Sequence, residues 1–124
     1  MLEFISKYTD IIRMQSHLLT ESDVYLSSAQ HEAVNNVVLY TNELMTFLKN
    51  HEQTHPHLTE ETIRHEIINF LIPIVGYIDM LADEWIGSLA PTQQSQVEII
   101  YENVHSLRKY VLSQQFKVAL CESA

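Results

Sequence analysis

The strongest constraint on this chain is a spacing of apolar residues by alternating steps of three and four, which recurs in four stretches. Because an α-helix brings residues at these steps onto one face, each stretch predicts a helix with one apolar side. The four sets are Phe4, Tyr8, Ile11 and Leu18; Val34, Val37, Thr41, Leu44 and Leu48; Ile63, Ile67, Phe70, Ile74, Tyr77 and Leu81; and Val97, Ile100, Val104, Leu107 and Val111. Four such helices predict a bundle with one shared core.

Polar or proline-containing segments separate the four stretches, and the chain holds only 2 glycines and 3 prolines, too few for the turns of a many-stranded β fold. Short connections favour antiparallel neighbours. The predicted fold is therefore an all-α, antiparallel four-helix bundle in a single domain over residues 1–124. The expected helices lie near 2–20, 27–50, 59–84 and 91–117.

The chain also suggests an internal repeat. A shift of 63 positions pairs identical residues in both halves, including positions expected in loops, such as Leu26 with Leu89 and Gln30 with Gln93. Chance agreement between two amphipathic hairpins is the alternative. A true repeat predicts two tandem hairpins, 1–50 and 59–117, that form either a single-chain pseudo-dimer or part of a homodimer. Under this shift, the position paired with His65 is Leu2.

Charge and composition narrow the class of partner. Sixteen acidic residues against seven basic ones give a formal charge of −9, so nucleic acid and anionic membrane surfaces are expected to be repelled, and a protein with a basic surface is a more natural partner. The single Cys121 cannot form an internal disulfide. No apolar run is expected to reach the length of a membrane span. These features predict a soluble, cytoplasmic protein.

One histidine stands out in the third stretch. With Ile67 and Ile74 at heptad position a, His65 falls at f, the outermost position, and points at solvent. Glu66 follows it directly and Asn69 lies one turn further on. A solvent-exposed imidazole is a competent nucleophile or proton carrier at neutral pH, and a nearby carboxylate can select its tautomer.

Two apolar residues lie close to this histidine. Ile68 and Ile72 fall at outward or boundary positions of the same helix, which favours a docking surface for a partner protein. The alternative for His65 is an exposed helical histidine with no role.

Two stretches of the chain resemble a known family. They read HEIINFLIPIVGYIDML (65–81) and LAPTQQSQVEIIYENVHSLRKYV (89–111), and they are similar to the dimerisation and histidine-phosphotransfer domain of bacterial sensor histidine kinases over about residues 61–112. The resemblance implies that His65 accepts a phosphoryl group, that Glu66 acts as acid or base, and that Asn69 positions water for dephosphorylation. Gly76 and Tyr77 match the family's Gly-Tyr pair.

The chain departs from the family pattern at two places. The arginine and proline that usually follow the His-Glu-aliphatic triplet are absent, and a proline appears later as Pro73. No ATP-binding domain follows the hairpin in this sequence, so we expect no autokinase activity. The resemblance then implies phosphotransfer at His65, or dephosphorylation of a response regulator. The alternative is a non-catalytic adaptor that binds a histidine kinase or response regulator.

Other motifs carry less weight. The segment HEAVN (31–35) repeats the His-Glu-x-x-Asn spacing without the Gly-Tyr continuation, and chance explains it best. The segment HEQTHPH (51–57) offers possible metal ligands, but a solvated loop is the simpler interpretation. We therefore predict no metal and no cofactor. A third functional interpretation is a structural bundle whose partners have nothing to do with phosphate.

Overall fold

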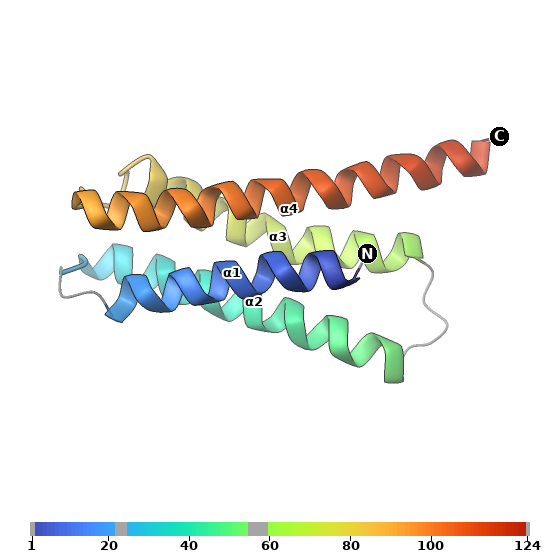
Figure 1. The fold of residues 1–124 in the computed structure, drawn as a ribbon, viewed down its shortest axis with the longest axis horizontal. Coiled ribbons are helices and arrows are strands. Elements are labelled where there is room, and N and C mark those ends of the chain that lie inside the picture. Colours follow the sequence, from blue (N-terminus) through green and yellow to red (C-terminus); the bar gives the residue numbers. More distant parts are fainter. Residues whose placement is uncertain (1, 22–24, 55–59, 124) are drawn as a thin grey trace.

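The computed structural model describes residues 2–21, 25–54 and 60–123 and places them in four α-helices. They are α1 (Leu2–Glu21), α2 (Ser28–Thr54), α3 (Glu60–Ala82) and α4 (Pro91–Ser123). Consecutive helices run in opposite directions (Figure 1). Each helix packs on two neighbours: α1 and α3 both lie between α2 and α4. The predicted all-α four-helix bundle is confirmed.

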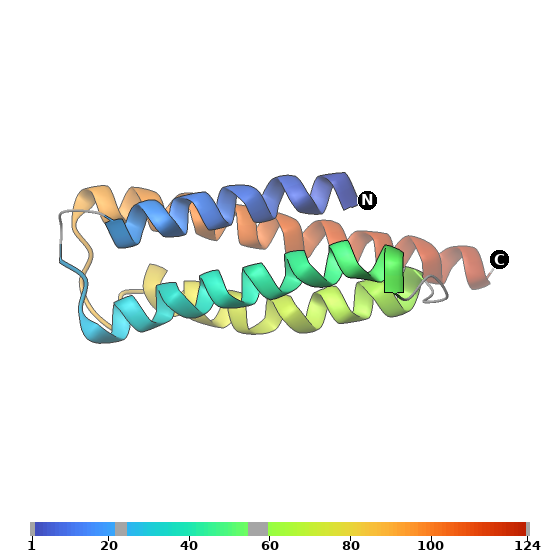
Figure 2. The ribbon, with the colours of Figure 1, turned by 90° about the horizontal axis from the view of Figure 1, so that it is seen from below.

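The bundle has two unlike ends. One end, here called the loop end, holds the connections from α1 to α2 and from α3 to α4 (Figures 1 and 2). The other, the terminal end, holds both chain termini together with the end of α2 and the start of α3. The longest helix, α4, extends past its neighbours there (Figure 1).

The core seams predicted for α2 and α4 are confirmed. Every predicted seam residue in these two helices is buried. The buried set is Val34, Val37, Thr41, Leu44, Leu48, Val97, Ile100, Val104, Leu107 and Val111. Thr41 is the one polar member, and its hydroxyl donates to the carbonyl of Val37 at 2.6 Å, so its burial leaves no unsatisfied hydroxyl.

The core face predicted for α1 is wrong by one position. Leu18 is 45% exposed and Ile11 is half-buried, whereas the buried face consists of Ile5, Thr9, Ile12, Ser16 and Leu19. Two of these are polar, which hid the seam from a search for apolar spacing. Their hydroxyls donate within the helix, Thr9 to the Ser6 carbonyl at 2.9 Å and Ser16 to the Ile12 carbonyl at 2.7 Å. The predicted Phe4 side chain lies outside the described residues.

The α3 seam is confirmed in part. Four of its predicted residues, Ile63, Ile67, Ile74 and Leu81, are buried. Phe70 and Tyr77 are half-buried instead and pack on aromatic rings of α2, with ring centroids 5.6 Å from Phe47 and 6.4 Å from Tyr40. Leu71 and Ile78 complete the core. The face that α3 buries is thus wider than a two-position heptad seam.

The burial pattern refines the internal repeat. Buried positions of α2 and α4 match at the predicted shift of 63, but those of α1 and α3 match at 62: Ile5 with Ile67, Ile12 with Ile74, and Leu19 with Leu81. The α3–α4 connection therefore holds one residue more than the α1–α2 connection. The counterpart of His65 is Glu3, which corrects the pairing with Leu2. The two hairpins share one core register.

Both second helices begin with a glutamine whose side chain accepts from the backbone N–H three residues earlier. In α2, the Gln30 Oε1 accepts from the Ser27 backbone N–H at 2.8 Å while the Ser27 hydroxyl accepts from the Gln30 N–H at 3.1 Å, which is a reciprocal capping box. In α4, the Gln93 Oε1 accepts from the Ala90 N–H at 2.8 Å. Both glutamines are buried. The match of Gln30 with Gln93 at a shift of 63 therefore reflects the same hydrogen bond at the start of each helix.

The two connections at the loop end are bonded to each other. The Ser27 hydroxyl donates to the Ile86 carbonyl at 3.1 Å, and the Gln30 Nε2 donates to the Ser88 carbonyl at 2.9 Å. Gly87 lies beside this bond with φ of +143°, and a Cβ there would come within 2.7 Å of the Gln30 Nε2. Glycine is required at this position by both its backbone angle and the close approach.

Among the described residues, α3 is the one helix long and apolar enough to cross a membrane, judged by length and composition over Glu61–Ala82. The expectation that the chain has no membrane span therefore stays a prediction. The core helix of a soluble protein passes the same test. In this fold 28% of the apolar window is buried, because one face of α3 packs on α2 and α4 while the rest is exposed.

Candidate functional site

The predicted site residues lie on the outward side of α3. His65 and Asn69 are exposed one helical turn apart, and Ile72 follows at the next turn with 63% of its surface exposed. The line continues to Gly76 and Met80, which are also exposed. We call these five residues the α3 stripe. None of them carries a formal charge when His65 is neutral, so the stripe offers one imidazole and one amide on an otherwise apolar surface.

The other two predicted residues lie at the edge of the stripe. Glu66 and Ile68 are half-buried, and Ile68 packs against the core. Adjacent residues of a helix point about 100° apart, so Glu66 does not face His65. Within the part of the chain that the structure describes, His65, Glu66 and Asn69 form no side-chain hydrogen bond. The predicted orienting contact between Glu66 and the imidazole is therefore not formed in this structure.

Pro73 changes the backbone beneath the stripe. It lies inside α3 and has no N–H, so the helical hydrogen bond that would end on the Asn69 carbonyl cannot form. The helix continues on both sides of it. The backbone carbonyl of Asn69 therefore lacks its helical donor, and the amide side chain of Asn69 is exposed. This turn thus has two groups that can form hydrogen bonds on an otherwise apolar helix.

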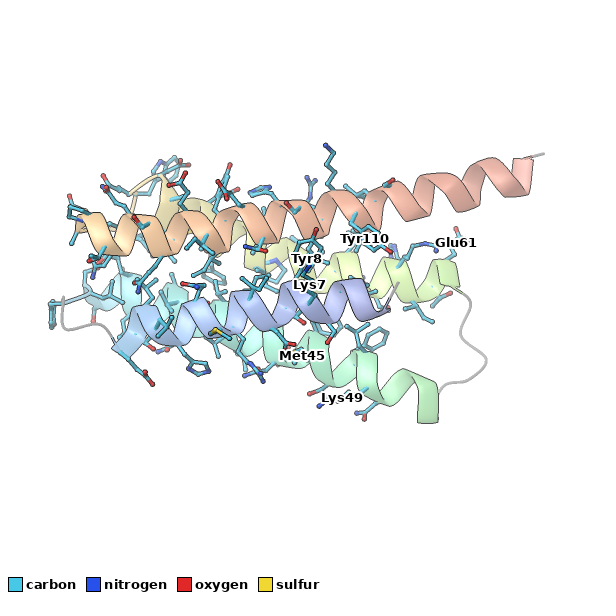
Figure 3. All side chains as sticks on the ribbon, viewed as in Figure 1. Lys7, Tyr8, Met45, Lys49, Glu61 and Tyr110 are labelled. Carbon is cyan, nitrogen blue, oxygen red and sulfur yellow. The ribbon has the colours of Figure 1, made fainter. Side chains whose placement is uncertain are left out.

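The equivalent surface of α1 is different. The α1 counterparts of Asn69, Ile72 and Met80 are Lys7, Asp10 and Leu18, so a cation and a carboxylate occupy positions that are neutral on α3. Figure 3 shows Lys7 on the outside of α1. Asp10 also pairs with Arg13 at 3.6 Å across two exposed side chains. The uncharged stripe therefore belongs to α3 alone among these two matched helices.

The second His-Glu-x-x-Asn segment, on α2, behaves differently from the first. His31 and Asn35 are exposed, and the Asn35 Nδ2 lies 3.0 Å from the His31 Nδ1. This contact occupies one ring nitrogen and restrains the ring. His65 and Asn69 have the same spacing but form no such contact, so the imidazole of α3 has both nitrogens available to a partner.

Sequence reasoning missed one polar pair. The His105 Nε2 of α4 lies 3.0 Å from the Asp79 Oδ1 of α3, and both side chains are partly exposed. The Tyr101 ring lies 4.3 Å from the His105 ring, centroid to centroid. The pair joins two helices and its members are 26 residues apart, so no spacing within one helix indicates it. It ties α3 to α4 near the loop-end half of the stripe.

No group of three or more His, Cys, Asp or Glu side chains that could hold a metal ion is found among the described residues. The possible ligands in HEQTHPH, from His51 to His57, lie outside the described side chains. The structure therefore leaves the prediction about that segment untested.

Comparison of the chain with models of protein families, with characterised proteins and with solved structures returns no match. The resemblance to histidine kinase phosphotransfer domains therefore rests on the residues of α3 and α4 themselves.

Proposed function

We propose that this protein is a two-component signalling module that meets a response regulator on the α3 stripe and exchanges or removes its phosphoryl group there. The observation that carries the proposal is the joint exposure of His65, Asn69 and Ile72 on successive turns of α3. An imidazole, an amide and an apolar contact on one line provide a nucleophile, a water-positioning group and a docking point.

Phosphotransfer at His65 needs a neutral ring and an accessible phosphorus. A ring nitrogen would attack the phosphorus of the regulator's aspartyl phosphate, forming a P–N bond while the P–O bond to the aspartate breaks and the carboxylate leaves. Because its side chain forms no hydrogen bond with described residues, His65 can turn toward an incoming phosphate.

Dephosphorylation is the second reaction that the stripe supports. The Asn69 amide lies one turn from His65 on the same exposed face, where it can hold a water molecule against a docked acyl phosphate. Water then attacks phosphorus, inorganic phosphate forms and the aspartate is released. This reaction forms no covalent bond to His65. Mutation of His65 or of Asn69 can therefore distinguish phosphotransfer from dephosphorylation.

The partner would be held by the apolar part of the stripe. Ile72 and Met80 expose apolar surface around Gly76, where an added Cβ would meet no atom within 4 Å beyond the backbone of its own helix. A partner helix can therefore approach α3 closely at this turn. Exposed apolar residues beside a reactive group are what a transient signalling contact requires.

The test uses purified response regulators from the source genome, phosphorylated on their aspartate with radiolabelled phosphate. We expect label on this protein that is lost in acid and stable in base, and no label on His65→Ala. Asn69→Ala should keep the label on His65 but slow phosphate release. Label that persists on His65→Ala would refute phosphotransfer at this residue.

A non-catalytic adaptor is the second candidate. The observation that favours it is the missing contact between Glu66 and His65, since an orienting carboxylate usually supports a reactive imidazole. In the same experiment an adaptor binds a regulator or a histidine kinase through Ile72 without taking up label. Ile72→Ala should then weaken binding while His65→Ala leaves it unchanged.

A further inference from the structure

Two large aromatic side chains are exposed at the loop end of the bundle. Tyr25, before α2, is 90% exposed, and Trp85, after α3, is 82% exposed. Tryptophan and tyrosine carry much of the binding energy where proteins meet, because each combines a large apolar ring with a polar group. Neither residue belongs to the α3 stripe.

These aromatic residues stand on a well-supported platform. The connection that holds Tyr25 is bonded to the connection that holds Trp85 through the Ser27 hydroxyl and the Gln30 side chain. The backbone N–H of Trp85 also donates to the Met80 carbonyl at 3.2 Å, which ties the turn to α3. A platform restrained in this way loses little conformational entropy when it binds.

The charge at this end has one sign. Residues 14–48 and 65–107 contain no lysine and no arginine. Of the seven lysines and arginines of the chain, Arg13 lies nearest to the loop end, and the others lie further toward the terminal end. Figure 3 shows two of them, Lys7 and Lys49, in the terminal half. Carboxylates lie around the two connections, on α1, on α2, on α4 and in the α3–α4 connection itself. The exposed ones are Glu21, Glu32, Asp83, Glu84, Glu98 and Glu102.

A hollow beside the α3–α4 connection has room for a partner side chain. Its volume is about 470 Å³, and its lining includes the buried Leu89 and Val97 together with the carboxylates of Asp83 and Glu98. The ring of Tyr101 forms part of its wall. A lining that combines apolar, aromatic and acidic side chains suits the aliphatic stem and cationic head of a lysine or arginine.

We propose that the loop end is a docking surface for a partner protein segment that places lysines or arginines around apolar side chains. Charge complementarity selects this occupant. A second copy of the chain would set carboxylates against carboxylates, and an anionic lipid surface would be repelled in the same way. The occupant would cover Trp85 and Tyr25 with its apolar residues and set its cations against Asp83 and Glu98.

This surface adjoins the α3 stripe at Met80 but lies far from His65, the residue proposed for phosphotransfer. From His65 to the end of α3 at Ala82 the helix rises by about 26 Å, at 1.5 Å per residue. A partner at the loop end therefore leaves His65 open, and either proposal can fail while the other holds.

Trp85 is the single tryptophan of the chain, so tryptophan fluorescence reports whether this side chain becomes buried. The probe is a synthetic amphipathic helical peptide with leucines on one face and lysines on the other, compared with a counterpart in which glutamate replaces lysine. Titration with the lysine peptide should shift the Trp85 emission to the blue in a saturable way that salt weakens. The glutamate peptide should cause no shift.

Variants locate the binding site, with affinity followed through a fluorescent label on the peptide. We expect Trp85→Ala, Tyr25→Ala and Asp83→Lys each to weaken binding about tenfold or more. Leu112→Ala, an exposed apolar residue of α4 away from the loop end, and Glu61→Lys, a matched charge reversal at the terminal end (Figure 3), should leave affinity unchanged.

Three outcomes would overturn the proposal. They are equal losses in the loop-end variants and in their matched controls, equal binding of the lysine and glutamate peptides, or a Trp85 shift with neutral phosphatidylcholine vesicles but not with the lysine peptide. Circular dichroism of each variant confirms that the helices remain folded, so a loss of binding is assigned to the surface.

Discussion

The two hairpins of this protein have matching cores and unlike exteriors. Buried positions agree between α2 and α4 at a shift of 63 and between α1 and α3 at a shift of 62, but α1 carries Lys7 and Asp10 where α3 carries Asn69 and Ile72. Close packing constrains the buried residues of both hairpins in the same way, because both contribute to one shared core. The exterior has no such constraint, so its differences point to function on α3.

The largest expected effect tests the matched cores. Leu44 on α2 and Leu107 on α4 are counterparts and both are fully buried. Leu44→Ala and Leu107→Ala should each lower the free energy of unfolding by about 3 kcal/mol, from lost burial and the cavity left behind. Urea denaturation measures both. A large effect at one position with almost none at the other would break the equivalence of the hairpins.

The next effect concerns the proline that only α3 contains. Pro73→Ala restores the helical bond to the Asn69 carbonyl and should raise the free energy of unfolding by about 1–3 kcal/mol. Its counterpart on α1 is Ile11, and Ile11→Pro should cost about 3 kcal/mol or more. Thermal unfolding compares the two variants. A loss of stability in Pro73→Ala would show that the proline is needed for the packing of α3.

The two glycines should respond with opposite signs. Gly87→Ala forces a Cβ against Gln30 at a φ of +143°, so we expect a loss of about 2 kcal/mol. Gly76→Ala adds a methyl group in open space on an exposed helix and should gain about 0.5–1 kcal/mol. Chemical denaturation measures both. A destabilised Gly76→Ala would contradict the open surface assigned to the α3 stripe.

The smallest effect is a pH dependence at the loop end of the second hairpin. The pKa of Glu84 lies below its ordinary value because its carboxylate accepts from the Gln94 side chain at 3.0 Å and from the Leu89 N–H at 3.2 Å. A lowered folded pKa means that stabilisation is present above the unfolded pKa and is lost as pH falls below about 4.5.

The measurement for Glu84 compares the wild type with Glu84→Gln across this range of pH. The wild type should be the more stable protein at neutral pH, and the difference should shrink as acid protonates the carboxylate. A difference that stays constant with pH would show that the charge of Glu84 is not what holds the connection.

Much of the fold could be predicted from apolar spacing, and the failures have a physical cause. The α2 and α4 seams were found because their core positions are apolar, with Thr41 the exception. In α1 the core holds Thr9 and Ser16, whose hydroxyls bond to their own helix, so polarity hid their burial. The adjacent pair Ile11 and Ile12 then allowed the face to be placed one residue early.

Only the features of the candidate site that depend on a single helix could be predicted. The heptad register placed His65 and Asn69 outside and Ile67 inside, and the structure agrees. The expected contact of Glu66 with the imidazole failed because neighbouring residues on a helix diverge. The pair of Asp79 with His105 joins two helices, and such contacts follow from the relative rotation of helices, which spacing does not determine.

The central claim is that the exterior of α3 carries the reactive histidine, and mapping of the labelled residue tests it most directly. Protein exposed to phosphorylated regulators is digested under alkaline conditions, and mass spectrometry locates the phosphohistidine among the seven histidines. We predict phosphate on His65 and none on His31, whose ring is held by Asn35 within the same sequence motif. Phosphate on His31, or on no histidine with any regulator, would contradict the account.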